Sequence, residues 1–235
     1  MRSRPPKHPQ PCHARPTRVR FGGIPARHGF RFELSGGRPC LDFVNTLDER
    51  LTDRPVERLR QFGDLVSWAA QTQAISRQEV AMLRRYGLNR PRAAQAALRR
   101  ATMVREAIFA VCSAASQRRN IAGPALAALA ESVSRAARRR HIQRRGNRFA
   151  WGWQPMTRVD PDLILMRAAW SAADLLTSPA ADRIRQCAGP GCAWLFLDTS
   201  KNRSRRWCDM TVCGNRIKAR RFYAKRKRSC AAAYR

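Results

Sequence analysis

The chain has 235 residues, in which 47 lysines and arginines outnumber 16 aspartates and glutamates, giving a formal net charge of +31. An apolar content of 44% is enough for a sizeable buried core and excludes a chain that is disordered throughout. A charge of this size points to a polyanionic partner, either nucleic acid or an anionic membrane surface.

We expect neither a signal peptide nor a membrane span. The first 20 residues are basic but lack the apolar segment of a signal peptide. The most apolar segment, residues 161–181, is interrupted by Arg167 and Asp174. We therefore expect a cytoplasmic protein without a membrane partner. Its eight cysteines then suit a metal site or buried thiols better than disulfides.

The chain is expected to begin with a disordered basic arm over residues 1–28. This segment is rich in proline, arginine and histidine and has few large apolar side chains. From Phe30 to Ser178 the apolar residues recur mostly with a helical period. We expect a helical domain over residues 29–178.

Several helix boundaries can be predicted within this domain. Ser76 and Glu79 have the spacing of a capping box, and Gly87 predicts the end of the helix that they open. Pro91 opens a longer helix with one inward stripe. The stripe contains Ala94, Ala97, Leu98, Ala101, Val104, Ile108 and Val111. Pro124 opens a third helix. Its predicted inward residues are Leu126, Leu129, Val133 and Ala137.

A β-hairpin and a last helix complete the predicted domain. Residues 141–153 read as a hairpin, because Gly146 and Asn147 accept the positive φ of a tight turn. Asp160 and Pro161 open a helix that ends before Pro179. Three tryptophans in these segments suit either plain core or the wall of an effector cavity. They are Trp151, Trp153 and Trp170.

Four cysteines near the C-terminus form two C-x4-C pairs separated by fifteen residues. They are Cys187, Cys192, Cys208 and Cys213. This spacing suits tetrahedral zinc, and the small, bent AGPG sequence inside the first pair suits the turn of a zinc knuckle. Four thiolates leave no coordination position for water, so we predict one structural Zn²⁺ ion. Residues 194–197 and 205–207 are expected to pair as strands around a polar turn.

Beyond the fourth cysteine, residues 214–228 predict a basic helix that Asn215 caps. The sequence leaves open whether Ile217 and Ala224 pack on the finger or whether Ala219, Phe222 and Tyr223 do. Residues 179–235 carry 15 basic and 3 acidic groups, and a zinc-anchored basic helix suits the major groove of DNA. The candidate nucleic-acid contacts are Arg203, Arg205, Arg206, Arg216, Lys218, Arg220, Arg221 and Lys225. Most of them should meet phosphates, while Arg216, Lys218 and Arg220 are the candidates for reading bases.

The remaining polar residues do not predict catalysis. Cys40 and Cys112 lie on apolar helical faces, as buried thiols do, and Cys12 and Cys230 fall in expected tails. None of the four histidines has a nucleophile or paired carboxylate at a catalytic spacing, and no phosphate-cradling glycine loop is present. We therefore expect no enzymatic activity.

Three short segments near the C-terminus resemble the CGNR zinc finger: FLDTS at 196–200, RRWCDM at 205–210 and CGNR at 213–216. Upstream, LDFVNTLD at 41–48 resembles the opening of the ABATE domain that precedes this finger. The resemblance implies a bacterial transcription regulator, often stress-related, with a mainly helical N-terminal domain and a finger that binds DNA. Whether the helical domain senses a small-molecule effector or forms a homodimer stays open.

The resemblance also divides the chain. An ABATE-like helical domain at 29–178 is followed by a CGNR-type zinc finger with a basic C-terminal helix at 183–228 and a tail at 229–235. Asp42 and Asn45 fall within the ABATE-like motif, where they either line a pocket or hydrogen-bond a neighbouring turn.

Together these features predict a mainly α fold with a small hairpin, followed by a treble-clef-like finger of a β-hairpin and a helix. The predicted function is that of a zinc-dependent DNA-binding transcription regulator. Two alternatives stay open: an RNA-binding or ribosome-associated zinc protein, and a redox-responsive switch that releases zinc. The DNA sequence that it recognises, the direction of regulation and the oligomeric state do not follow from the sequence.

Overall fold

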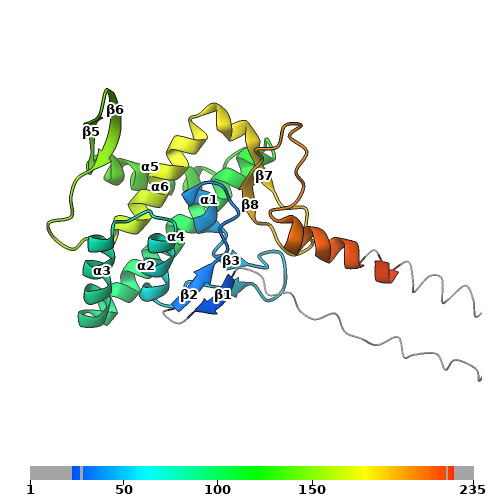
Figure 1. Ribbon diagram of the computed structural model, residues 1–235, viewed down its shortest axis with the longest axis horizontal. Helices are drawn as coiled ribbons and strands as arrows, with labels where there is room; N and C mark the ends of the chain where they lie inside the picture. The colour runs from blue at the N-terminus through cyan, green and yellow to red at the C-terminus, as the bar shows by residue number, and fades with distance from the viewer. Residues whose placement is uncertain (1–22, 27–28, 221, 225–235) are drawn as a thin grey trace, which may run out of the picture.

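The computed structural model describes residues 23–26, 29–220 and 222–224 (Figure 1). Its helices are α1 (Pro39–Val44), α2 (Phe62–Gln71), α3 (Arg77–Asn89), α4 (Pro91–Ser116), α5 (Gly123–Ala137) and α6 (Leu163–Leu176). A 3₁₀ turn, η1 (Pro179–Arg183), and a π turn, η2 (Met210–Gly214), lie toward the C-terminus. The predicted mainly α fold with small hairpins is confirmed.

The strands form two-stranded antiparallel sheets. β1 (Gly23–Ala26) pairs with β2 (Gly29–Phe32), β3 (Leu47–Asp48) with β4 (Val56–Glu57), β5 (Arg140–Arg145) with β6 (Arg148–Trp153), and β7 (Ile184–Gln186) with β8 (Leu195–Leu197). The predicted hairpin is β5–β6, and Gly146 at its turn has a φ of +58°. The predicted disordered arm is too long, because β1 lies inside it and Ile24 pairs with Arg31. Residues 1–22 and the predicted tail at 229–235 lie outside the described residues.

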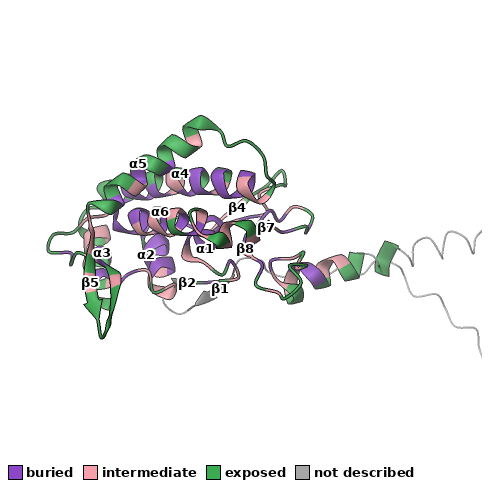
Figure 2. Ribbon diagram, turned by 90° about the horizontal axis from the view of Figure 1, so that it is seen from above, coloured by how far each residue is buried: buried purple, intermediate pink, exposed green. Residues whose placement is uncertain are grey.

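α4 runs through the centre of the helical domain and contacts every other helix from α1 to α6. Its predicted inward stripe is buried except for Val104, which is half-buried. Small residues such as Ala94, Ala97 and Ala101 let the neighbouring helices approach closely. Figure 2 shows the buried residues on the inward sides of α4 and α6 and exposed residues along the projecting β5–β6 hairpin.

The boundaries of α3 follow one local sequence signal and depart from another. Ser76 and Glu79 form the predicted capping box: Glu79 N donates to Ser76 Oγ (3.2 Å) and Ser76 N to Glu79 Oε2 (2.7 Å). Gly87 does not end α3, which continues to Asn89. A Cβ at Gly87 would lie 3.2 Å from the ring of Phe62, so the glycine allows α2 to pack closely instead.

α5 keeps only part of its predicted inward face: Leu129 is buried and Val133 packs against the core as predicted, but the rest of the face is shifted. Leu126 is 47% exposed, and Ala137 is also exposed, whereas Ser132 and Ala136 are buried. Ser132 can be buried because its hydroxyl donates to Ala128 O (2.9 Å) on the preceding turn. Ser132, although polar, therefore belongs to the inward face of α5.

The predicted last helix, α6, begins after an ion-pair network around the buried Asp162. Asp162 precedes its first residue and accepts hydrogen bonds from Arg100 and Arg135. Burial opposes ionisation of Asp162, but these two guanidinium groups hold its pKa below the usual range. The network fixes the start of α6 against α4 and α5.

Arg105 holds the β3–β4 hairpin against α4. Its side chain is 3% exposed and pairs with Glu57 through two hydrogen bonds of 2.7 Å. It also donates to Thr46 Oγ1 (3.1 Å). A buried guanidinium needs such partners, because an unpaired buried charge is strongly destabilising.

The β7–β8 hairpin joins the helical domain to the cysteine-rich segment. Ile184 and Leu195 belong to the main hydrophobic core, whereas Trp194 and Phe196 pack with the cysteines in a second core. The strand pairing predicted for residues 194–197 and 205–207 was wrong, because β8 pairs with β7. Asp198 explains the difference: its carboxylate accepts from Ser200 N (2.9 Å) and Arg205 N (3.0 Å), which holds the following segment in a loop.

Candidate metal centre

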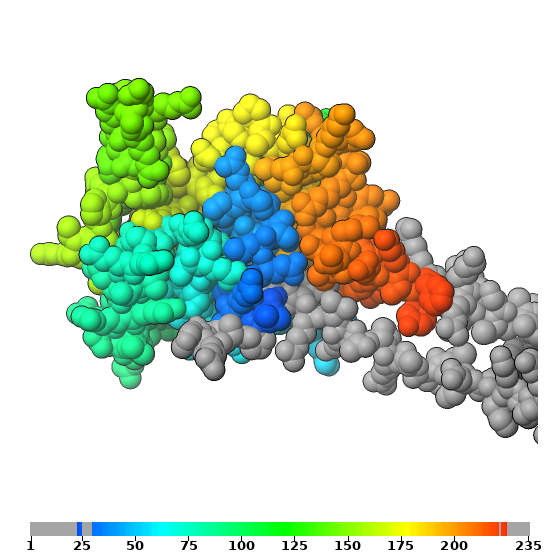
Figure 3. Space-filling model, in the orientation of Figure 1, coloured from blue at the N-terminus to red at the C-terminus, as the bar shows by residue number. Residues whose placement is uncertain are grey.

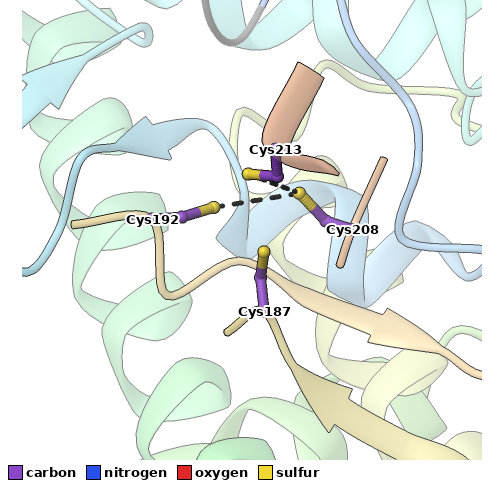
Figure 4. A group of neighbouring side chains, drawn as sticks. All are labelled: Cys187, Cys192, Cys208 and Cys213. Atoms are coloured by element: carbon purple, nitrogen blue, oxygen red, sulfur yellow. Dashed lines mark hydrogen bonds between the residues drawn. The ribbon is translucent and has the colours of Figure 1, made fainter. Parts of the chain in front are cut away.

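The four predicted ligands converge on one point in the structure (Figure 4). Their Sγ atoms all lie within 4.8 Å of one another, and all four side chains are buried. Cys208 Sγ lies 3.8 Å from that of Cys192 and 3.6 Å from that of Cys213. A disulfide would require about 2.05 Å. A tetrahedron with Zn–S bonds of about 2.3 Å has edges of about 3.8 Å, so the separations fit zinc.

The first two ligands flank the turn between β7 and β8. Cys187 N donates to Trp194 O (2.8 Å) and Cys192 N to Gly189 O (3.0 Å), which closes the knuckle. Gly189 is required here, since a Cβ would lie 2.9 Å from Cys213 Sγ and 3.3 Å from Cys187 Sγ. The backbone can therefore approach the sulfur atoms, and Gly189 N donates to Cys187 Sγ (3.4 Å).

The second pair lies at the start of the C-terminal helix. Cys208 precedes the helix and Cys213 lies within η2, after which residues 215–220 and 222–224 are helical. Asp209 caps this start, because its carboxylate accepts from Thr211 N (2.6 Å) and Val212 N (3.0 Å). Asn215 was predicted as the cap but lies a turn further along. The Asp-x-Thr sequence was the signal that identifies the cap.

The chemistry of the donor set agrees with its geometry. Hydrogen bonds from the other three thiols lower the pKa of Cys187 well below its usual range, whereas interaction with Cys187 and burial raise the pKa of Cys192 and Cys208. A divalent cation at the centre supplies the positive charge that four neighbouring thiolates need. Four buried sulfur ligands leave no room for a reactive water molecule. The cluster is the site of one structural zinc ion, as predicted.

Two family models match the chain once this geometry is in view. Residues 183–226 match the CGNR zinc finger. Residues 37–179, more than half of the chain, match the ABATE family, described as "Putative stress-induced transcription regulator". The chain belongs to the ABATE family. The predicted order of the two domains is confirmed. No curated protein matches the chain.

Asn45 connects the ABATE domain directly to the CGNR finger. It follows α1, and its amide makes a pair of hydrogen bonds with the backbone of Leu195 in β8. Nδ2 donates to Leu195 O (2.9 Å) and Oδ1 accepts from Leu195 N (2.9 Å). The side chain thus acts as a one-residue strand partner at the free edge of β8, and both residues are buried.

The β3–β4 hairpin adds a second contact to the zinc knuckle. Leu51 N donates to Gly191 O (3.3 Å), and a Cβ at Gly191 would lie 2.6 Å from Thr52 Cγ2. Asp48 is fully buried beneath this contact. Burial raises its pKa to about 6, although the guanidinium of Arg58 (2.6 Å) and the indole of Trp194 favour its charged form. No local pattern indicates this contact, because its residues are about 140 positions apart.

Asp42 is buried beside the same interface. Its Oδ1 accepts from Gly36 N (2.8 Å), and Gly36 O accepts from Leu197 N (2.8 Å) in β8. Burial raises the pKa of Asp42 to about 6, and the bond from Gly36 opposes the shift. The structure thus places both residues of the pocket hypothesis, Asp42 and Asn45, in hydrogen bonds within the interior.

The candidate nucleic-acid contacts fall into three groups. The exposed ones are Arg203, Arg206, Lys218 and Arg220, the half-buried ones are Arg205 and Arg216, and Arg221 and Lys225 lie outside what the structure describes. On the helix, Ile217 is half-buried, whereas Ala219, Phe222, Tyr223 and Ala224 are exposed. The finger therefore packs on the side of the helix that carries Ile217.

The two half-buried arginines brace the metal site. Arg205 lies over the ring of Phe196, 4.5 Å from its centroid, and donates to Trp207 O (2.9 Å) and to Cys208 O. Arg216 donates to Pro190 O (3.1 Å) in the knuckle. Sequence alone could not separate these structural arginines from the exposed ones, because both kinds occur in the same basic run.

Replacing Cys208 by serine tests the metal centre. We expect wild-type protein to contain one zinc per chain and the Cys208→Ser protein to contain less. Its C-terminal helix should also lose order, because a structural zinc site contributes on the order of 10 kcal/mol to folding. Zinc content is measured by mass spectrometry and helicity by circular dichroism. Cys112→Ala, which removes a buried thiol outside the cluster, should keep its zinc. Equal zinc in all three proteins would contradict the assignment.

Replacing Asn45 by alanine tests the link between the domains. The change leaves the buried N–H and C=O of Leu195 unpaired, which should cost about 2–4 kcal/mol of unfolding free energy. Zinc should also pass faster to a coloured chelator, because the knuckle loses an anchor. Asn89→Ala, at an exposed asparagine, is the control. The link is not supported if Asn45→Ala and Asn89→Ala release zinc equally fast.

Replacing Asp42 by asparagine tests the cost of a buried charge. An unfolded aspartate has a pKa of about 3.9, so raising it to about 6 in the folded state makes stability fall as the pH rises through this window. The asparagine side chain cannot ionise. We therefore expect Asp42→Asn to stabilise the protein by about 1–3 kcal/mol at pH 7.5, with the difference vanishing near pH 4. Urea unfolding at a fixed free-zinc concentration measures it; a variant less stable than wild type at pH 7.5 would refute the expectation.

Proposed function

We propose that this protein is a zinc-dependent DNA-binding transcription regulator without enzymatic activity. The observation that carries the proposal is a basic helix whose first turn supplies a zinc ligand and whose outer side carries exposed Lys218 and Arg220. Figures 1 and 3 place this helix at one end of the molecule, away from the helices of the ABATE domain. A duplex can therefore approach it without meeting the helices of the ABATE domain.

Zinc gives this helix a fixed direction. Cys213 ties it to the knuckle, the knuckle is tied to β8, and Asn45 ties β8 to the ABATE domain. A rigid helix loses little entropy when it enters a groove. Arg203 and Arg206 lie exposed on the loop before it and suit neighbouring phosphates, which set the register without reading sequence. Lys218 and Arg220, exposed on the helix itself, are the residues that we propose to enter the groove.

For the ABATE domain we favour effector sensing over dimerisation. A surface cavity lies between α3, Arg90 directly after it and the loop before α6. Its lining combines Met82 and Tyr86 with the guanidinium groups of Arg85, Arg90 and Arg158. That combination suits a small anion with an apolar part.

No described helix is both long and apolar enough to cross a membrane.

The alternative functions receive less support from the site. A redox switch requires oxidants to reach sulfur, but the four ligands are at most 5% exposed. An RNA-binding role would use the same exposed basic groups, so only relative affinity separates it from DNA binding. The absence of acidic side chains from residues 210–220 fits either polyanion.

The double change Lys218→Ala/Arg220→Ala tests DNA binding. On a duplex of arbitrary sequence, Lys218 and Arg220 act by neutralising phosphates, so each one lost should reduce the slope of log affinity against log salt by about 0.9. We therefore expect a change of about 1.8 and an affinity loss of about tenfold or more. Fluorescence anisotropy with a 20-base-pair duplex at several salt concentrations measures both. Arg84→Ala/Arg92→Ala removes the same charge from exposed positions on α3 and α4 and should have little effect.

A structured RNA of equal length completes the experiment. Tighter binding to RNA than to duplex DNA at the same salt concentration would favour the RNA-binding alternative. An unchanged duplex affinity and salt slope in the Lys218/Arg220 variant would exclude this helix as the DNA-binding element.

A further inference from the structure

The β5–β6 hairpin projects from the body at the end opposite the CGNR finger (Figures 1 and 3). Directly opposed residues of its two strands share a face. One face carries the pairs Arg140–Trp153, Ile142–Trp151 and Arg144–Phe149. On the other face, Gly152 leaves room for the side chains of His141 and Gln143, which a Cβ would meet at 2.8 Å. The first face therefore carries the large aromatic groups, and the second is filled by its own side chains.

The aromatic face is anchored at its base and exposed toward its tip. The Arg140 guanidinium lies 4.7 Å from the ring centroid of Trp153 and 4.8 Å from that of Trp170 in α6. The ring of Trp151 meets that of Trp170 edge-on at 5.8 Å. Toward the tip of the hairpin the aromatic side chains become more exposed: Trp151 is 56% exposed and Phe149 is 77% exposed. The hairpin thus anchors Trp151 against α6 while leaving much of its surface, and most of Phe149, open.

The charge of the hairpin is entirely positive. Residues 138–153 contain six arginines and no acidic residue. Arg145 and Arg148 lie directly opposite each other beside the turn, on the face opposite to the aromatic one, and both are exposed. Like charges at such a position destabilise a hairpin unless an anion lies between them. Within the described residues, nothing accepts a hydrogen bond from the buried Nε of Arg140. The arginines therefore favour an anionic occupant.

We propose that the aromatic face of the β5–β6 hairpin binds single-stranded nucleic acid, with bases stacked on Phe149 and Trp151 and a phosphate bound by Arg144 on the same face. The strand then continues over the turn, where Arg145 and Arg148 on the opposite face bind further phosphates. Exposed aromatic rings on a strand pair suit unpaired bases, whose faces are free, better than a stacked duplex. The positive charge opposes a second copy of this hairpin as the occupant. This site is separate from the helix proposed to bind duplex DNA.

The first experiment measures binding of a fluorescein-labelled 15-residue oligothymidylate to the full chain. This chain carries Lys218→Ala/Arg220→Ala, which weakens nucleic-acid binding by the finger helix. In this background, Trp151→Ala should weaken binding about tenfold, and Trp151→Phe should restore most of it, because a ring remains for stacking. Arg144→Ala/Arg145→Ala/Arg148→Ala should reduce the salt slope by about 2. Arg84→Ala/Arg92→Ala/Arg99→Ala removes equal charge from α3 and α4 and is the control.

The second experiment locates the contact independently of affinity. An oligonucleotide containing 4-thiothymidine is crosslinked to the wild-type chain, and the modified peptides are mapped by mass spectrometry. We expect crosslinks to residues 148–153. Crosslinks confined to residues 201–228, or an unchanged affinity of the Trp151→Ala protein, would overturn the proposal while leaving DNA binding by the finger intact.

Two further outcomes would also overturn it. If Trp151→Ala converts a dimer into a monomer in sedimentation, the face joins two copies of the chain. If the hairpin variants lose binding to vesicles of anionic phospholipid but not to the oligonucleotide, the face binds a membrane surface.

Discussion

The coordination of four thiolates at one point is the interaction on which the C-terminal part of the structure depends. The residues that pack with the cysteines are few: Trp194 and Phe196 are buried with them, and Trp207 and Val212 are partly buried. A core of this size stabilises only a few turns of chain, so the metal has to supply most of the order. The backbone is shaped accordingly, since Gly189 lets it approach the sulfur atoms and Asp209 caps the helix that carries the last ligand.

The metal centre is nevertheless not an independent unit. β7 and β8 contribute Ile184 and Leu195 to the core of the ABATE domain, and Asn45 pairs with the backbone of Leu195. The two families matched by the chain are thus distinguishable in sequence but continuous in packing. A change in the ABATE domain near α1 or the β3–β4 hairpin would be transmitted to the zinc knuckle through direct contacts, without a flexible linker between them.

The sequence predicted the local features well because they depend on nearby residues. The ligand spacing identified the metal site, Ser76 and Glu79 identified a helix start, and Gly146 identified a hairpin turn. The failures have long-range causes. Gly87 has the local pattern of a helix end, but the residue that it accommodates, Phe62, lies in another helix. Residues 205–207 have the pattern of a strand, but hydrogen bonds to Asp198 hold this segment in a loop.

The site residues show the same division. All four metal ligands followed from their spacing, whereas the roles of Arg205 and Arg216 did not follow from their positions in a basic run. Asn45 was singled out by a motif, yet its partner lies 150 residues away and only the folded chain brings the two together. Pairings over such separations depend on tertiary packing, which local propensity does not encode.

The shared hairpin has a consequence for how the two domains are inherited. Zinc fingers that fold alone can be moved between proteins as cassettes, since their outer surface is polar on every side. The β7–β8 ribbon of this finger instead has an apolar side that needs α1 and α4 as its lining. A finger of this kind, transferred alone to an unrelated protein, would expose Ile184 and Leu195 to water. Gene rearrangements should therefore keep the ABATE domain and the CGNR finger together.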